Sequence, residues 1–199
     1  MLKAIIFDID GVLADSRSAV VQNTAELLSE LGYGAEMEKI VAMSSAHSAE
    51  TVLATLVPGI EGDLHLKGRM LERLSQITAK NLHLVTPTLL AKRLGRVSER
   101  YALAAASNRK SSAKMVLEKL GILGLFRTVV TSADAPPKPD PKMIALALER
   151  LGVAPEEAVF LGDNAEDGVA GRAAGVRTII MDGTDDAECE KFLKEIGCG

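Results

Sequence analysis

Apolar runs rich in β-branched residues alternate with segments of helical spacing through most of this chain. The first run begins at Lys3 and is ended by Gly11, a residue with the backbone freedom that a turn requires. Strands that alternate with helices are typical of a parallel sheet with right-handed crossovers. The sequence therefore predicts the α/β fold class, a Rossmann-like parallel sheet with helices on both faces.

The pattern also predicts where the chain leaves this alternation. Between Val12 and His83 no convincing strand is found, and the apolar spacing is helical. We expect a discontinuous α/β core of residues 1–14 and 83–199, with residues 15–82 inserted as a small α-helical cap. Further strands are predicted at 101–107, 129–131, 158–162 and 176–181, and helices at 18–31, 40–43, 49–56, 64–77, 87–94, 112–120, 141–151, 164–174 and 188–196.

Polar side chains follow three of the predicted strands. Asp8 and Asp10 end the first, Ser107 ends the second along the chain, and Asp163 follows the strand at 158–162. Lys138 lies between prolines in a nearby loop. Ligands of open α/β sheets bind outside the carboxyl ends of the strands, so these groups are expected to converge. Paired carboxylates at a buried strand end suggest a hard cation such as Mg²⁺, and with it phosphate chemistry.

Four motifs in this order resemble the haloacid dehalogenase-like superfamily, and within it the phosphoglycolate phosphatase branch. They are Asp8-Ile-Asp10-Gly-Val, Ser107-Asn108, Lys138-Pro-Asp-Pro and Gly162-Asp-Asn-Ala-Glu-Asp167. The resemblance covers most of the chain and includes a small helical cap in the same place. It implies a Mg²⁺-dependent phosphomonoesterase that hydrolyses a small, phosphoglycolate-like organic phosphate through an aspartyl-phosphate intermediate.

The catalytic roles follow from carboxylate and ammonium chemistry and agree with the resemblance. Asp8 is predicted to be the nucleophile and a metal ligand, because a carboxylate can attack phosphorus. Asp10 is predicted to protonate the leaving oxygen and then to accept a proton from water, and the resemblance implies that its backbone carbonyl also binds the metal. Lys138 would hold the transferred phosphoryl group or the Asp8 carboxylate. Asp163 is the third predicted metal ligand.

The remaining core residues have substrate or supporting roles. Ser107 and Asn108 are predicted to bind phosphate oxygens through the hydroxyl and backbone N–H groups. Asp167 is either an outer partner of water or Lys138, or a negative charge that stabilises the start of a helix. Arg109 and Lys110 are expected to form a solvated face, with a substrate contact as the alternative.

Two residues of the predicted cap are candidates for substrate binding. Ser45 and His47 lie in a polar stretch from Ser44 to Glu50. The core motifs engage only the phosphoryl group, so residues outside the core are expected to recognise the rest of the substrate.

Two other functions fit part of the pattern. A sugar-phosphate phosphomutase would share the aspartyl-phosphate and differ in the group that accepts the phosphoryl group. A phosphorylated regulatory or binding module also combines acids, hydroxyls and a lysine on a parallel sheet, but has no inserted cap.

Composition limits the partners of the protein. The net charge of −4 and the absence of a long basic run argue against duplex nucleic acid. No apolar stretch approaches the roughly 20 residues that span a bilayer, and the chain starts without a leader pattern. Cys189 and Cys198 lack the spacing of a zinc site or a disulfide framework. We expect a cytoplasmic monomer or homodimer that acts on a small phosphorylated metabolite, away from nucleic acids and membranes.

Overall fold

The chain forms two units, residues 1–15 together with 86–199 and residues 16–85, each with its own hydrophobic core. The computed structural model describes residues 1–199 except 35–36, 45–48, 58, 61 and 111. The boundaries predicted from the sequence lie after residues 14 and 82, whereas the units meet after residues 15 and 85.

The larger unit contains a five-stranded sheet in the order β5-β4-β1-β6-β7, with every neighbouring pair parallel. The central strand is β1, and its Phe7 is in register with Ala105 on one side and Leu161 on the other. The strands are β1 (Ala4–Phe7), β4 (Ala102–Ser107), β5 (Thr128–Thr131), β6 (Ala158–Gly162) and β7 (Arg177–Ile180). This arrangement confirms the predicted α/β fold class.

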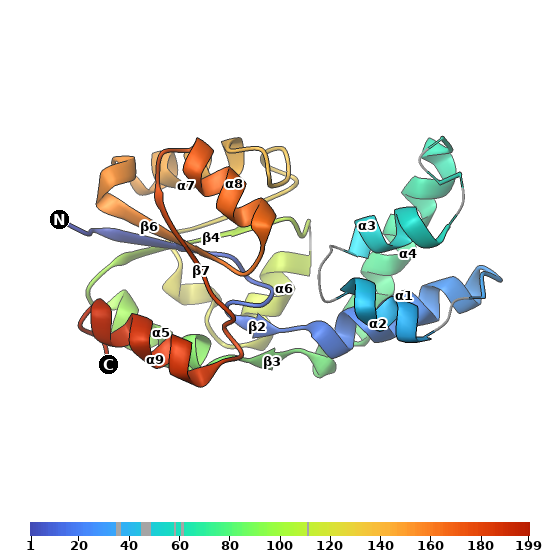
Figure 1. Cartoon of the computed structure of the whole chain (residues 1–199), viewed down its shortest axis with the longest axis horizontal. Coiled ribbons are helices and arrows are strands. Elements are labelled where there is room, and N and C mark those ends of the chain that lie inside the picture. The colour runs from blue at the N-terminus through green and yellow to red at the C-terminus, as the bar shows by residue number, and fades with distance from the viewer. Residues whose placement is uncertain (35–36, 45–48, 58, 61, 111) are drawn as a thin grey trace. The chain divides into compact units, whose positions relative to one another are not determined.

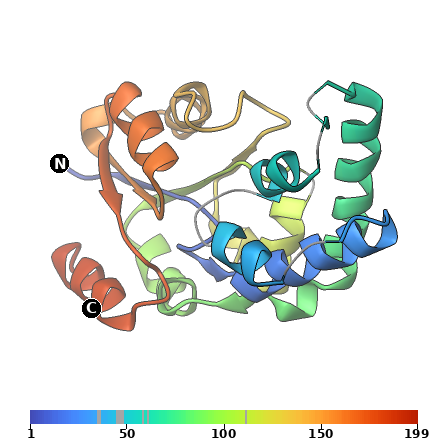
Figure 2. The same ribbon diagram turned by 45° about the vertical axis from the view of Figure 1, so that its right-hand side comes forward.

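Helices cover both faces of the sheet. Helices α7 and α8 lie on one face, and α5, α6 and α9 lie on the other, as the views in Figure 1 and Figure 2 agree. The helices are α5 (Leu89–Ser98), α6 (Ser112–Lys119), α7 (Lys142–Leu151), α8 (Ala165–Ala173) and α9 (Asp186–Glu195), with short 3-10 turns at Leu123–Leu125 and Pro155–Glu157.

Alternation along β1 supplies the core on both faces, because successive strand side chains point to opposite sides. Ile6 is fully buried in a cluster with Met143 and Ile144 of α7. The ring of Phe7 meets Phe126 edge-on, with ring centroids 6.5 Å apart. Burial on both faces explains why β1 is a continuous apolar run rather than an alternating one.

Two local predictions about this unit are wrong. Pro87 does not begin α5, because Thr88 is its N-cap and accepts a hydrogen bond from the N–H of Ala91. Pro87 instead belongs to β3 (Thr86–Pro87), which pairs with β2 (Ala14–Asp15) in a two-residue antiparallel ladder. This pairing also places a strand in a region where the sequence indicated none; a two-residue strand is too short to produce a periodic pattern.

The smaller unit is helical. Buried apolar residues from the four α-helices in its described part form its core, including Leu27, Ile40, Leu53 and Met70. The helices are α1 (Arg17–Glu30), α2 (Met37–Ser44), α3 (Ala49–Leu56) and α4 (Leu64–Lys80), followed by a 3-10 turn at Leu82–Leu84. The Asn81 amide at the end of α4 donates to Asn23 Oδ1 of α1 at 2.9 Å, which joins these two helices by a buried polar contact.

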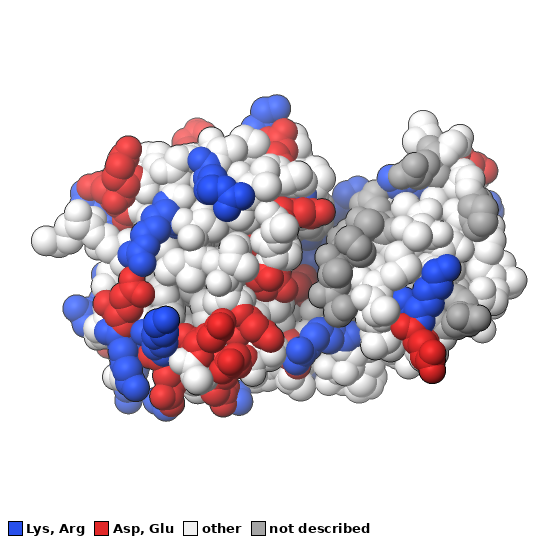
Figure 3. Space-filling view, in the orientation of Figure 1, with Lys and Arg blue, Asp and Glu red and all other residues white. Residues whose placement is uncertain are grey.

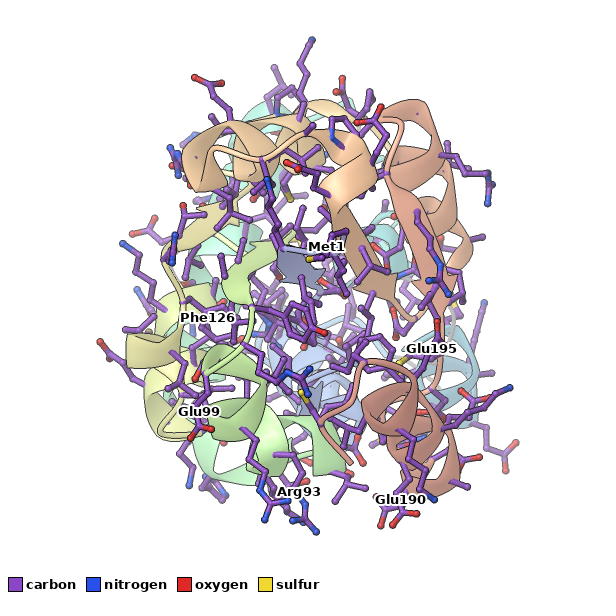
Figure 4. The ribbon with its side chains drawn as sticks, turned by 90° about the vertical axis from the view of Figure 1, so that its left-hand side faces the viewer. Met1, Arg93, Glu99, Phe126, Glu190 and Glu195 are labelled. Carbon is purple, nitrogen blue, oxygen red and sulfur yellow. The ribbon has the colours of Figure 1, made fainter. Side chains whose placement is uncertain are left out.

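Acidic and basic side chains are mixed over the face drawn in Figure 3, and the densest cluster of charged side chains on it is acidic. That group lies over the start of α9, where Asp182, Asp185, Asp186 and Glu188 are exposed. Figure 4 shows the end of the sheet where the strands begin: Met1 lies near the centre, while Arg93 of α5 and Glu190 of α9 extend outward. Among the described residues, every helix falls short of the length and apolar character that a membrane span requires.

Candidate active site

The predicted polar residues follow strands that are neighbours in the sheet. β1 lies between β4 and β6, and all three run parallel. Asp8 directly follows β1, Ser107 is the last residue of β4, and Asp163 directly follows β6. Their positions meet at one edge of the sheet, the edge at which ligands of this fold class bind.

Lys138 lies at the centre of this edge, and its side chain is almost completely buried. Its Nζ is 2.8 Å from Asp8 Oδ1 and 2.6 Å from Asp167 Oδ1, and it donates to the carbonyl of Ala106 at 3.0 Å. These three partners match the three donors of an ammonium group. The proline-bounded loop therefore brings its lysine to Asp8, as the sequence indicated, and the contact with Asp167 favours the supporting role for that acid over a purely helix-start charge.

Burial has the largest effect on the pKa values of Asp8 and Lys138, and the charges around each group come next. Burial raises the pKa of Asp8 well above its ordinary value, and Lys138 opposes this while Asp167 adds to it. Burial lowers the pKa of Lys138, but Asp8 and Asp167 more than offset that effect and leave it above its ordinary value. The lysine thus remains a cation and balances part of the negative charge around Asp8.

Three carboxylates could hold a cation. One oxygen each from Asp8, Asp163 and Asp167 lies within 4.8 Å of the other two. Loss of surrounding water, and secondarily the Asp167 charge, raises the pKa of Asp163 to about 6 although this residue is exposed. The donors are all oxygen atoms, the set preferred by hard cations such as Mg²⁺. The residues present therefore fit a divalent cation, whose charge would offset the repulsion among them.

Two glycines make this crowding possible. A Cβ added at Gly11 would lie 1.9 Å from Asp163 Oδ2, and one added at Gly162 would lie 2.3 Å from the Cβ of Asp167. Gly11 also has a φ of +74°, a conformation that favours glycine. Both motif glycines thus allow the acids to approach the end of β1.

Ser107 and Asn108 connect the end of β4 to the lysine loop. Ser107 is buried, and its Oγ accepts a hydrogen bond from the N–H of Arg109. The Asn108 amide donates to the carbonyl of Lys138 at 3.0 Å, and its Oδ1 accepts from the N–H of Lys138 at 2.8 Å. The side chain of Asn108 therefore fixes the lysine loop, a supporting role that the sequence analysis did not assign to it.

Arg109 is a functional candidate whose pairing with Asp10 was not predicted from the sequence. Its Nε and Nη2 each lie 2.7 Å from an oxygen of Asp10, and its side chain is only 14% exposed. Burial acts to lower the pKa of Arg109, but the Asp10 charge and hydrogen bonds raise it. The expectation that Arg109 lies on a solvated face is wrong. The available signal was its position just after β4, the strand that neighbours β1 and hence Asp10.

Asp10 is placed differently from the other predicted metal ligands. The predicted set was Asp8, Asp10 and Asp163, whereas the carboxylate group within 4.8 Å contains Asp167 in place of Asp10. The Asp10 carboxylate pairs with Arg109 instead. A role for Asp10 in metal binding through its backbone carbonyl stays a prediction. Ser45 and His47, the predicted substrate-binding residues of the cap, lie outside the described residues.

The amino-acid sequence is similar to those of known hydrolases and phosphatases. Residues 5–181 match the family model described as haloacid dehalogenase-like hydrolase. The chain is 47% identical over 70 residues to pyrophosphatase PpaX of Bacillus velezensis, a match that covers 35% of this chain and 32% of that protein. It is 28% identical over 186 residues to phosphoglycolate phosphatase of Nitrosococcus oceani, covering 89% of this chain and 82% of that protein.

Solved structures show the same fold. The crystal structure of a predicted phosphoglycolate phosphatase from Haemophilus somnus superimposes with a TM-score of 0.77 at 19% identity. The match covers 95% of this chain and 98% of that chain.

Proposed function

Because the chain belongs to the haloacid dehalogenase-like hydrolase family, we propose that it is a Mg²⁺-dependent phosphatase. Its proposed substrate is a small organic phosphate monoester, with phosphoglycolate as the first candidate. The observation that carries this proposal is the buried Asp8 carboxylate, which Lys138 contacts at 2.8 Å among two further carboxylates. Full-length similarity to a protein named phosphoglycolate phosphatase supports the choice of substrate class.

Asp8 is the proposed nucleophile. One of its oxygens attacks phosphorus, the bond from phosphorus to the ester oxygen breaks, and an aspartyl-phosphate forms. Water then attacks this intermediate, which releases phosphate and restores the carboxylate. Lys138 is 2.8 Å from Asp8 Oδ1, so the same ammonium group can stabilise charge on the phosphoryl oxygens during both displacements. Ser107, at the end of the neighbouring strand, supplies a further hydrogen bond to these oxygens.

Asp10 is the proposed general acid and base. It follows Asp8 by two residues, close enough to the reacting centre to protonate the leaving oxygen and later to accept a proton from water. Help of this kind contributes on the order of 10²–10⁴-fold to the rate.

The proposed metal ligands are the carboxylates of Asp8 and Asp163 and the backbone carbonyl of Asp10. Asp167 is proposed to support the site through its contact with Lys138, 2.6 Å away. Mg²⁺ bound there would offset the negative charge of the nucleophile and the phosphate as they approach.

The smaller unit is proposed to act as the cap that selects the substrate, with Ser45 and His47 contacting the part beyond the phosphate. We also propose that the enzyme works on a small phosphorylated metabolite in the cytoplasm, where the free thiols of Cys189 and Cys198 stay reduced.

A phosphate-release screen tests the proposal. The purified protein is incubated with phosphoglycolate, inorganic diphosphate, several sugar phosphates and an aryl phosphate, with Mg²⁺ and after exhaustive chelation. We expect phosphate release that requires Mg²⁺ and disappears in Asp8→Asn, an isosteric variant with a poor nucleophile. Full activity after chelation, or undiminished turnover by Asp8→Asn, would reject the mechanism. Conversion of a sugar phosphate to its isomer without release of phosphate would identify a phosphomutase instead.

A further inference from the structure

Arg109 and Asp10 form a two-bond ion pair beside the proposed nucleophile. Arg109 Nε lies 2.7 Å from Asp10 Oδ2, and Nη2 lies 2.7 Å from Asp10 Oδ1. Two parallel N–H···O bonds fix the orientation of a carboxylate as well as its position. A lysine in the same place would supply charge without this fork geometry.

We propose that Arg109 is a positioning residue that orients the Asp10 carboxylate for proton transfer. This inference rests on the proposed function, in which Asp10 is the general acid and base. It assigns Arg109 no contact with the substrate; its effect on the rate passes through Asp10.

The side chain of Asp10 is less enclosed than that of Asp8, so the fork of Arg109 adds to what fixes its orientation. Strand β1 ends at Phe7, and Asp10 lies in the turn beyond it, where its backbone forms an isolated bridge with Ala14. Its side chain is 34% exposed, whereas that of Asp8 is 7% exposed. Packing therefore restricts Asp10 much less than it restricts Asp8. A proton-transfer group must nevertheless keep a defined geometry, because misplacement by about 1 Å can cost on the order of 10²-fold in rate.

Arg109 is itself held firmly enough to orient another group. Its backbone N–H donates to Ser107 Oγ at 3.2 Å, and its Nη1 donates to Ser112 Oγ at 3.3 Å. Ser107 is the last residue of β4, and Ser112 is the first residue of α6. The backbone of Arg109 is therefore held to the end of β4 and its guanidinium to the start of α6, and the side chain is largely removed from solvent.

The ion pair is compatible with proton transfer at Asp10. Each carboxylate oxygen offers two lone-pair directions, and the fork takes one on each oxygen. The proton that Asp10 donates to the leaving oxygen, and the one that it later accepts from water, can occupy a remaining direction. Lower solvent exposure separates this pair from an ordinary surface contact such as Arg177–Glu195, whose side chains are 66% and 48% exposed.

A double-mutant cycle tests the inference in the full-length protein with Mg²⁺ and an aryl phosphate. The four proteins are the parent, Asp10→Asn, Arg109→Gln and the double variant. We expect Arg109→Gln to lower kcat on the order of 10²-fold with KM little changed. In the Asp10→Asn background, the same substitution should change kcat by no more than about twofold, because its effect depends on Asp10.

Three further variants separate positioning from folding. Arg109→Lys keeps the charge and should recover only part of the lost kcat. Ser112→Ala removes the contact to Nη1 and should lower kcat severalfold, again only when Asp10 is present. Arg177→Gln removes an exposed arginine–carboxylate pair of the same unit and should leave kcat unchanged. Thermal unfolding of each protein checks that the variants fold.

The outcomes distinguish this inference from the proposed function. Equal losses from Arg109→Gln in both backgrounds would overturn it, since Arg109 would then act independently of Asp10. A rise in KM at unchanged kcat would overturn it in favour of a substrate contact, and full activity of Arg109→Lys would overturn the need for the fork. If the parent released no phosphate, or if Asp10→Asn kept parental activity, the proposed function itself would fail.

Discussion

The N–H of Gly183 donates a 2.7 Å hydrogen bond to the carbonyl of Gly11, in the turn that follows Asp10. Gly183 lies between β7 and α9, so this bond ties a distant loop to the turn that follows Asp10. Asp163 also lies close to Gly11, where an added Cβ would meet its carboxylate. The turn that carries Asp10 is therefore contacted by two loops from the same edge of the sheet.

Gly183→Ala should destabilise the protein and lower its activity. The new Cβ would lie 2.3 Å from the carbonyl of Val12 and 2.6 Å from that of Gly11. These are backbone atoms, which cannot rotate away, so we expect a loss of about 1–3 kcal/mol in the free energy of unfolding. Urea denaturation and phosphate release measure the two effects. Gly124→Ala is the matched control, because an added Cβ there meets nothing within 4 Å; equal stability of the two variants would contradict the steric argument.

Lys138→Met should be among the most damaging single changes in the core. It leaves Asp8 and Asp167 buried without their shared cation, and removal of one partner from a buried ion pair costs about 3–5 kcal/mol. We expect a lower denaturation midpoint together with loss of turnover. Lys142→Met is the control, since Lys142 is exposed and lies 3.8 Å from Asp140, and its effect should stay within about 0.5 kcal/mol. A Lys138→Met protein as stable as this control would show that the ammonium group is not needed to balance the buried acids.

Much of the core was predictable from sequence because its signals are local. Strand β6 matches its predicted range, and α7 differs from its prediction only at its first residue, since burial on both faces makes strands apolar and Gly152 ends the helix. The convergence of Asp8, Lys138 and Asp163 followed from the rule that parallel strands end at one edge. These inferences required no knowledge of which strands are neighbours.

The Arg109–Asp10 contact and the start of α5 were not predicted, because both depend on residues that are distant in the sequence and close in the fold. Contact between Arg109 and Asp10 requires that β4 lie beside β1, although the two residues are 99 positions apart. The start of α5 depends on the Thr88 hydroxyl, which donates to the carbonyl of Val12 at 2.8 Å as well as capping the helix. A local preference for proline in the first turn of a helix could not reveal that contact.

The stability of the metal-free protein should fall as pH rises through the range set by Asp163. The pKa of this group is about 6 in the folded state and 3.8 ordinarily, so between these values the folded state binds more protons than the unfolded state. The free energy of unfolding from this group therefore decreases as pH increases. In chelator, Asp163→Asn should raise Tm relative to the parent more at about pH 7 than at about pH 5.

Mg²⁺ should offset the higher Tm of Asp163→Asn at about pH 7. A cation that binds the ionised carboxylate stabilises the folded state, so Mg²⁺ should raise Tm of the parent at about pH 7 and raise that of Asp163→Asn much less. Glu190→Gln, on the exposed face of α9, provides a charge-matched control that should not alter either response. An equal Mg²⁺ shift in parent and Asp163→Asn would remove Asp163 from the proposed metal ligands.

Substrate ranking should depend on Ser45 and His47 of the smaller unit. The proposed core groups meet only the phosphoryl group, and one set of such contacts serves many esters, so discrimination requires polar groups from outside the core. Ser45→Ala and His47→Ala are therefore expected to change relative kcat/KM across the substrate panel by about two- to tenfold, the equivalent of about 0.5–1.5 kcal/mol for each lost hydrogen bond. Turnover of an aryl phosphate, which lacks the polar leaving group, should change little.

His65→Ala, in an exposed position of α4, is the matched control and should preserve the ranking. If the Ser45 and His47 variants also preserve it, the polar stretch from Ser44 to Glu50 does not select the substrate, and the determinants of specificity lie elsewhere in residues 16–85 or in the core loops.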